Sequence, residues 1–150
     1  EIAGVVEAVG DGVTNFKPGD RVLAGIGNGG LAEKVVVPAG RIFPVPEGVP
    51  FEKAASLLMT YGTTIHGLKD RGHIKTDDIV LVLGAAGGVG LSAIELAKAF
   101  GARVVAAVSS EAKGDVSRQA GADEIVIYPK GEMGKDASKE LANAFKTACG

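Results

Sequence analysis

The sequence predicts an α/β protein in which a short antiparallel β region precedes a doubly wound parallel sheet. Three observations lead to this fold class. Residues 1–46 contain short extended runs separated by turn signals, and strands alternate with helices of ten to fifteen residues from residue 79 onward. The runs at 79–83 and 104–108 are nearly all apolar, which is typical of strands covered by helices on both faces.

The first region is expected to form antiparallel strands at residues 2–9, 21–24 and 33–37. Glycine, proline and asparagine separate these runs, as in Lys17-Pro18-Gly19-Asp20. The proline-rich stretch 45–50 is the expected junction with the second region.

The hydrophobic period changes at Phe51, where helical patterns begin. Gly101 and Gly121 follow two of the expected helices, at positions where a left-handed cap favours glycine. The expected helices cover residues 51–59, 63–69, 88–100, 113–120 and 137–148, and the expected strands cover residues 79–83, 103–108 and 124–128.

The composition excludes several classes of protein. The 150 residues carry a formal charge of −2, so the basic excess typical of nucleic-acid binders is missing. The longest apolar stretch, 79–91, contains four glycines and is too short to cross a bilayer. The single cysteine, Cys149, excludes an internal disulfide and indicates a reducing, cytoplasmic compartment. Because the chain begins at Glu1 without methionine, it is interpreted as a fragment, and a targeting segment could have been lost upstream.

Two glycine-rich stretches compete as candidate phosphate loops. Residues 25–30 match G-x-G-x-x-G, but residues 31–38 behind them are short, β-branched and closed by a proline, which offers no helix dipole. Residues 84–90 follow an apolar strand and open a helix, so backbone N–H groups and a helix N-terminus can face a pyrophosphate. Ala85 occupies the first glycine position, while Gly87 would allow close approach of the anion and Gly90 close helix packing. The sequence therefore predicts the dinucleotide site at residues 84–90.

The residues at the end of the strand expected at 103–108 indicate which type of dinucleotide binds. They read Val108-Ser109-Ser110, without the acid that accepts a hydrogen bond from a free ribose 2′-OH. Ser109, Ser110 and Lys113 suit a 2′-phosphate instead, which favours NADP(H) over NAD(H). Glu111 lies close enough to compete, and the alternative for Lys113 is a solvated residue of the first helical turn.

These motifs resemble the quinone oxidoreductase (zeta-crystallin-like) branch of the zinc-independent medium-chain dehydrogenase/reductase superfamily. The resemblance is carried by Asp77-Asp78-Ile79-Val80-Leu81, by Ala85-Ala86-Gly87-Gly88-Val89-Gly90 and by Lys98. Supporting stretches lie at residues 4–10, 17–22, 59–63 and 120–123, and Glu95 departs from the glutamine usual in the family signature.

The resemblance implies that residues 1–48 are the C-terminal part of a GroES-like catalytic domain and that residues 49–150 are the first half of a Rossmann NADP-binding domain. It implies hydride transfer from NADPH to a quinone or another α,β-unsaturated carbonyl, commonly in a homodimer. It also implies cofactor-binding roles by position. Ala86, Gly87, Gly88, Val89 and Gly90 would line the pyrophosphate, Ser109, Ser110 and Lys113 the 2′-phosphate, Tyr128 the adenosine, and Thr60 and Tyr61 the nicotinamide.

Simpler roles remain open for three of these residues. Tyr128 could just end a strand, and Thr60 and Tyr61 could cap or pack a helix. Zinc-dependent members of the superfamily place a Cys or His ligand in the stretch that reads Ala54-Ala55-Ser56-Leu57-Leu58 here, so ligand chemistry disfavours zinc. No catalytic acid or base is assigned, because His66 and His73 have no obvious carboxylate partner by spacing.

Two other functions are carried as alternatives. One is an enoyl-thioester or carbonyl reductase on the same scaffold, and the other is an NADPH-binding protein with a structural or regulatory role.

A further expectation concerns the edge of the parallel sheet. In the strand order 3-2-1-4-5-6, the strand at 79–83 would be an unpaired apolar edge, so the natural chain is expected to continue beyond Gly150 or the piece to self-associate.

Overall fold

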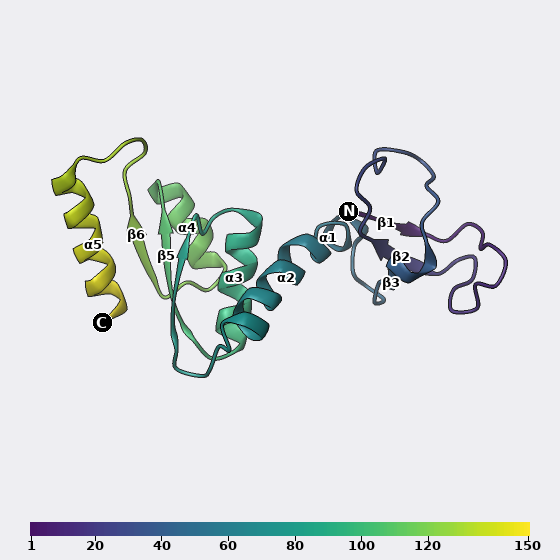
Figure 1. The fold of residues 1–150 in the computed structure, drawn as a ribbon, viewed down its shortest axis with the longest axis horizontal. Helices are drawn as coiled ribbons and strands as arrows, with labels where there is room; N and C mark the ends of the chain where they lie inside the picture. Colours follow the sequence, from purple (N-terminus) through teal and green to yellow (C-terminus); the bar gives the residue numbers. More distant parts are fainter. The chain divides into compact units, whose positions relative to one another are not determined.

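The computed structural model describes all of residues 1–150, and the chain divides into two compact units. The first unit is Glu1–Gly62 and the second is Thr63–Gly150. Figure 1 shows the elements of each unit along the chain, with strands β1 to β3 in the first and β4 to β6 in the second.

The first unit is built on a small antiparallel sheet with the strand order β1-β2-β3. Its strands are β1 (Ile2–Val5), β2 (Arg21–Ala24) and β3 (Ile42–Pro44), with a short 3-10 helix, η1 (Ala39–Arg41), before β3. Helix α1 (Phe51–Ala54) follows, and α2 (Leu57–Ile65) begins in this unit. Leu23, Val45 and Ala54 form its buried core.

Two charged side chains tie the strands to the helices of this unit. The guanidinium of Arg21 lies 4.2 Å from the centroid of the Phe51 ring, and its Nη2 donates to the carbonyl of Val49. The carboxylate of Glu1 accepts from the backbone N–H groups of Leu58, at 3.1 Å, and Met59, at 2.5 Å. Glu1 therefore satisfies donors at the amino end of α2, where a negative charge is favourable.

Two predictions for this region were wrong, and one strand was missed. The first strand ends at Val5 instead of continuing to residue 9, and residues 33–37 form no strand. The third strand of the sheet is Ile42–Pro44, which pairs with residues 22–24 of β2. Residues 35–37 are three β-branched valines, as in a strand, but residues 33–37 have no paired neighbour and Val36 is fully exposed. A strand pattern without a partner does not make a strand.

The helices after Phe51 also differ from the predicted boundaries. The first ends at Ala54, and α2 extends across residues 60–62, which were expected to separate two helices. The Ser56 hydroxyl donates to backbone carbonyls of the preceding turn, including that of Lys53 at 3.0 Å, and this local bond competes with regular helix. A π-helical segment, η2 (His66–Arg71), continues from α2.

The second unit confirms the predicted parallel sheet with helices. Its strands β4 (Ile79–Leu83), β5 (Arg103–Val108) and β6 (Glu124–Ile127) are parallel in the order β4-β5-β6. Helices α3 (Gly88–Ala99), α4 (Glu111–Gln119) and α5 (Lys135–Cys149) follow the strands in turn. The predicted bounds of β4 and β5 are confirmed, and Gly101 and Gly121 have the expected positive φ angles of 86° and 107°.

Strand β5 is the centre of this unit. On one side of the sheet Val104, Ala106 and Val108 pack with Ile94 and Ala97 of α3. A separate cluster joins Val105 to Val126 and to Ala148 of α5. Residues 104–108 are buried throughout, as expected for a strand covered on both faces.

Strand β4 lies at the edge of the sheet, as its place in the strand order predicted. The expectation that it would be buried like β5 was wrong, because Ile79 is 45% exposed and Leu83 is 65% exposed. An edge strand has a neighbour on one side only, so its apolar ends stay accessible. None of the helices is long and apolar enough to span a bilayer.

Asp123 joins α3, β5 and the turn before β6. Its carboxylate accepts from Lys98 Nζ at 2.8 Å and 2.9 Å and from the Val104 backbone N–H at 2.7 Å. The hydrogen bond from Lys98, followed by that from Val104, holds the pKa of this carboxyl below its ordinary value. The stabilisation is therefore complete above the unfolded-state pKa, about 3.9, and is lost as pH falls through the folded-state value.

We expect Asp123→Asn to destabilise the fold by on the order of 1 kcal/mol at pH 7, with the difference from wild type shrinking below about pH 4. Urea unfolding at pH 7 and pH 3 measures this. Asp115→Asn, which removes the surface partner of Arg118, is the control with the same change of charge. An equal loss of stability for Asp123→Asn at both pH values would contradict the assignment.

Candidate functional site

The glycine-rich turn between β4 and α3 is a tight bend fixed by backbone contacts. Gly84 has a φ of 64°, in the left-handed region that glycine enters without strain. The Ala85 N–H donates to the carbonyl of Ala107 at 3.2 Å, and the Gly87 N–H donates to that of Gly84 at 3.1 Å. The turn is thereby tied to the end of β5 before the helix begins.

Gly90 lets the first turn of α3 lie directly on this bend. A Cβ at Gly90 would come within 2.7 Å of the backbone of Ala85, closer than real side-chain atoms approach. Gly90 and Ala85 are both buried. Residues 84–90 thus form a compact cradle in which any side chain at position 90 would force the helix away from the turn.

The amino end of α3 has the geometry of an anion site. Its N-cap is Gly87, in extended conformation with φ −83° and ψ 167°, and no side chain caps the helix. The first helical bond runs from the Leu91 N–H to the Gly87 carbonyl at 2.8 Å, so the N–H groups of Gly88, Val89 and Gly90 precede the hydrogen-bonded ladder. Gly87, Gly88 and Val89 are exposed. Uncapped donors at a helix N-terminus suit a phosphate group.

Ser109, Ser110 and Lys113 are brought together at the tip of β5. Lys113 Nζ lies 3.4 Å from Ser109 Oγ, and Ser110 is the N-cap of α4 in extended conformation. Glu111, the expected competitor, lies beside Arg118, with 3.8 Å between Glu111 Oε2 and Arg118 Nη2. Part of its negative charge is therefore compensated on the helix surface.

Tyr128 and Ala86 lie at the same carboxyl edge of the sheet. The Tyr128 N–H donates to the carbonyl of Val108 at 2.9 Å, which places Tyr128 next to the β5 tip. Tyr128 and Ala86 are half-buried. Because β4, β5 and β6 are parallel, their carboxyl ends share one edge, and all the predicted pyrophosphate and adenosine residues follow these ends.

Thr60 and Tyr61, predicted to approach the nicotinamide, belong to the first unit. Both are half-buried on α2. The Thr60 hydroxyl donates to the carbonyl of Ser56, the residue just before α2, at 2.5 Å, and this local bond matches the alternative of a structural role.

The sequence reasoning missed two side chains beside the glycine turn. Ser92 Oγ donates to the carbonyl of Val89 at 2.9 Å, and Thr64 Oγ1 lies 2.7 Å from Ser92 Oγ. Ser92 could have been found, because it follows Val89 by three positions on a predicted helix. Nothing in the sequence pattern signals that Thr64, 28 positions earlier, meets it.

The expectation that His66 lacks a carboxylate partner was wrong. His66 Nδ1 lies 3.0 Å from Asp70 Oδ2, one helical turn later, on the surface of η2. The spacing of four residues is the signal that was overlooked.

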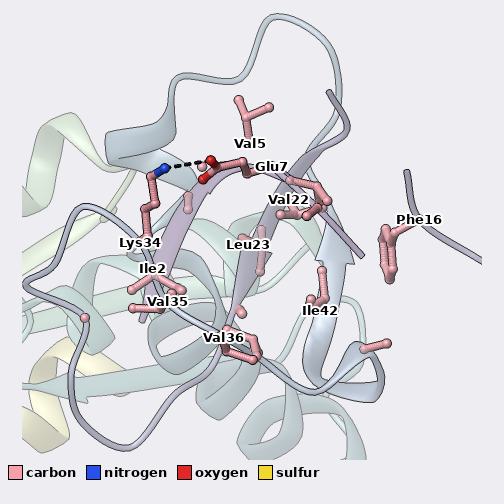
Figure 2. A pocket seen from close by; sticks show the side chains of 18 of the residues that line it. Ile2, Val5, Glu7, Phe16, Val22, Leu23, Lys34, Val35, Val36 and Ile42 are labelled. Atoms are coloured by element: carbon pink, nitrogen blue, oxygen red, sulfur yellow. Dashed lines mark hydrogen bonds and ion pairs between the residues drawn. The ribbon is translucent and has the colours of Figure 1, made fainter. Parts of the chain in front are cut away.

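The first unit contains a hollow of about 690 Å³ between the sheet and residues 30–37. Figure 2 shows apolar side chains around it, among them Ile2, Val22 and Val36, with the ion pair between Lys34 and Glu7 at 2.6 Å on its rim. None of the predicted site residues lines it. The hollow lies between the strands and this loop, and it contributes no predicted residue to the candidate nucleotide site.

Two family models match the chain. Residues 1–47 match the alcohol dehydrogenase GroES-like domain, and residues 88–148 match the model described as zinc-binding dehydrogenase. Within residues 1–150 no group of three or more His, Cys, Asp or Glu side chains is placed to hold a metal ion.

Individual proteins match over most of this chain. A quinone oxidoreductase-like protein 2 homolog from Nematostella vectensis is 39% identical over 145 residues, which cover 95% of this chain and 39% of the relative. The structure of mycobacterial Rv1454c complexed with NADPH gives a TM-score of 0.84 at 37% identity, over 97% of this chain and 44% of that one.

The Escherichia coli quinone oxidoreductase complexed with NADPH gives a TM-score of 0.74 at 31% identity, over 94% of this chain and 43% of that one. The chain thus spans less than half the length of these three proteins. The glycine cradle, the parallel sheet behind it and these similarities agree, and the chain belongs to the quinone oxidoreductase branch of the medium-chain dehydrogenase/reductase superfamily.

Proposed function

We propose that this protein is an NADPH-dependent oxidoreductase that transfers a hydride to a quinone or another α,β-unsaturated carbonyl without zinc. The observation that carries the proposal is the uncapped amino end of α3, held on the 84–90 bend by the contact between Gly90 and Ala85. The NADPH complexes and the quinone oxidoreductase names among its relatives support the choice of cofactor and acceptor. The same proposal assigns residues 1–48 to a GroES-like domain and residues 49–150 to half of a Rossmann domain.

The backbone of residues 86–90 would bind the pyrophosphate. Donors of Gly88, Val89 and Gly90 point out of the first turn of α3, and the helix dipole favours an anion there. Gly87, whose added Cβ would meet only the Gly84 carbonyl at 3.5 Å, leaves open space over these donors. The turn thus binds by shape and backbone polarity instead of by a formal positive charge.

Ser109, Ser110 and Lys113 would bind the adenosine 2′-phosphate. The ammonium of Lys113 is 3.4 Å from the Ser109 hydroxyl, so a phosphate between them would receive charge-assisted and neutral hydrogen bonds together. Tyr128, fixed at the β5 tip by its backbone bond to Val108, would contact the adenosine. Thr60 and Tyr61 would approach the nicotinamide, although the Thr60 hydroxyl also donates to the carbonyl of Ser56, just before α2.

Bound NADPH supplies the hydride, and a quinone becomes a hydroquinone by taking that hydride and one proton from solvent. The chain's own residues would hold the cofactor and orient it, and we assign no catalytic acid or base among them. A homodimer and a cytoplasmic location belong to the same proposal.

The function is tested by following NADPH oxidation at 340 nm with a panel of acceptors. We expect turnover with quinones and small enones and no effect of a zinc chelator. Turnover confined to enoyl thioesters would identify the alternative reductase. Tight NADPH binding without oxidation by any acceptor would contradict the enzyme proposal and favour a structural or regulatory role.

The two glycines of the turn should separate binding from folding. In Gly87→Ala the added Cβ makes an ordinary contact and the backbone is already extended, so we expect the free energy of unfolding to stay within about 0.5 kcal/mol of wild type. Because this Cβ would occupy the space over the N–H donors, we expect NADPH binding to be at least about tenfold weaker. Gly90→Ala forces a clash with the Ala85 backbone, so we expect a loss of about 1–3 kcal/mol.

Thermal melts and fluorescence titration with NADPH measure both effects. Gly134→Ala is the matched control, because Gly134 is the extended N-cap of α5 and its added Cβ meets nothing. Wild-type NADPH affinity in the Gly87→Ala protein would exclude residues 84–90 as the pyrophosphate site.

Lys113 should decide between the two dinucleotides. We expect Lys113→Gln to weaken NADPH binding about tenfold or more and to leave NADH binding unchanged, because only NADPH carries the 2′-phosphate. Titrations of both nucleotides measure the ratio. Lys139→Gln on α5 makes the same change of net charge and should leave the ratio at its wild-type value. An equal loss for both nucleotides would show that Lys113 does not contact the 2′-phosphate.

A further inference from the structure

Two hydroxyls are buried between α2 and α3, where apolar side chains are the rule. Thr64 is 5% exposed and Ser92 is 1% exposed, and their oxygens lie 2.7 Å apart. Burying a hydroxyl is costly unless it is hydrogen-bonded, so such a pair persists where its bonds are satisfied. Both residues belong to the second unit, so the contact lies within one compact body.

Both hydroxyls converge on the carbonyl of Val89. Ser92 Oγ lies 2.9 Å from that oxygen, and Thr64 Oγ1 lies 3.4 Å from it. One arrangement of the two protons satisfies the closer contacts, in which Thr64 donates to Ser92 Oγ and Ser92 donates to the Val89 carbonyl. The bond from Ser92 is local to α3, whereas the bond from Thr64 to Ser92 links α3 to a separate helix, α2.

The Val89 peptide is part of the first turn of α3, between the two glycines of positions 88 and 90. Glycine neighbours give this turn more backbone freedom than an ordinary helix start has. The turn also lacks a side-chain cap. The hydrogen bond from Ser92 to the Val89 carbonyl, with Ser92 itself held by Thr64 of α2, therefore restricts the orientation of peptide groups whose N–H donors face the anion site.

We infer that Thr64 and Ser92 are positioning residues, which act through the Val89 carbonyl to hold the first turn of α3 in the orientation that binds the pyrophosphate. This inference rests on the proposed function and adds to it a support outside the glycine motif. Neither side chain touches the nucleotide. Because they keep the turn ordered before the cofactor arrives, less conformational entropy is lost when the cofactor binds.

The test compares two ligands that share the adenosine end. NADPH spans the turn of α3 and the β5 tip, whereas 2′-AMP carries the 2′-phosphate but no pyrophosphate. We expect Thr64→Val, which keeps the shape but removes the hydroxyl, to bind NADPH about threefold to tenfold more weakly and 2′-AMP with wild-type affinity. Thr64→Ser retains a hydroxyl and should restore NADPH binding.

Val105→Ala is the control for a general loss of stability. Val105 is fully buried in the cluster that includes α5, away from the cluster of α3. It should lower the melting temperature at least as much as Thr64→Val does and leave the affinity for both ligands unchanged. Hydrogen exchange of the amides of residues 88–91 without ligand should be faster in Thr64→Val than in Val105→Ala.

Three results would overturn the inference. Wild-type NADPH affinity in Thr64→Val would remove the link to the cofactor, and an equal loss of NADPH and 2′-AMP would show a general loosening. A loss of NADPH affinity in Val105→Ala equal to that in Thr64→Val would also show a general loosening. If the wild-type protein bound 2′-AMP and NADPH equally or neither at all, the proposed pyrophosphate site itself would fail, which is a distinguishable outcome.

Discussion

The close contact between the backbones of Gly90 and Ala85 is the constraint on which the second unit depends. A helix that follows a strand through a short bend can lie on its own sheet only if its first turn passes over the bend without a side chain between them. Here a Cβ would sit 2.7 Å from three atoms of Ala85. The same contact lets Ile94 and Ala97 reach Val104 and Val108, so the packing of the core and the exposure of the α3 donors have one cause.

The second unit could be predicted because its signals are local and strong. Strand β5 contains an uninterrupted apolar run at residues 104–108 between polar turns, and such a run between helical patterns is typical of a strand covered on both faces. The bounds of β4 and β5 follow from sequence alone. The exposure of β4 did not follow from its composition, because Leu81 and Leu83 carry the same side chain. Leu81 packs against the cluster of Val105, Val126 and Ala148, whereas Leu83 at the end of the strand is exposed.

The first unit depends on pairing between distant segments, which a single sequence encodes weakly. Residues 33–37 have the composition of a strand and form none, whereas Ile42–Pro44 ends in a proline and pairs with β2. The candidate site likewise has parts that short motifs predict and a part that depends on distant residues. The glycine cradle and the Ser109, Ser110 and Lys113 cluster follow from motifs a few residues long, but the contact of Thr64 with Ser92 joins residues 28 positions apart and needs the packing of two helices.

Net charge says little about such a site. The chain is slightly acidic, yet the carboxyl edge of its sheet presents the uncapped donors of α3 and an ammonium at Lys113. Helix dipoles and peptide N–H groups act over one turn, and formal charges in water are screened within about 10 Å. The local geometry of the site therefore outweighs the net charge of the protein. The pairing of Glu111 with Arg118 adds to this, because a carboxylate with a partner repels a phosphate less than an isolated one does. An acidic chain can therefore bind a polyanionic cofactor wherever its backbone, instead of its side-chain charge, forms most of the site.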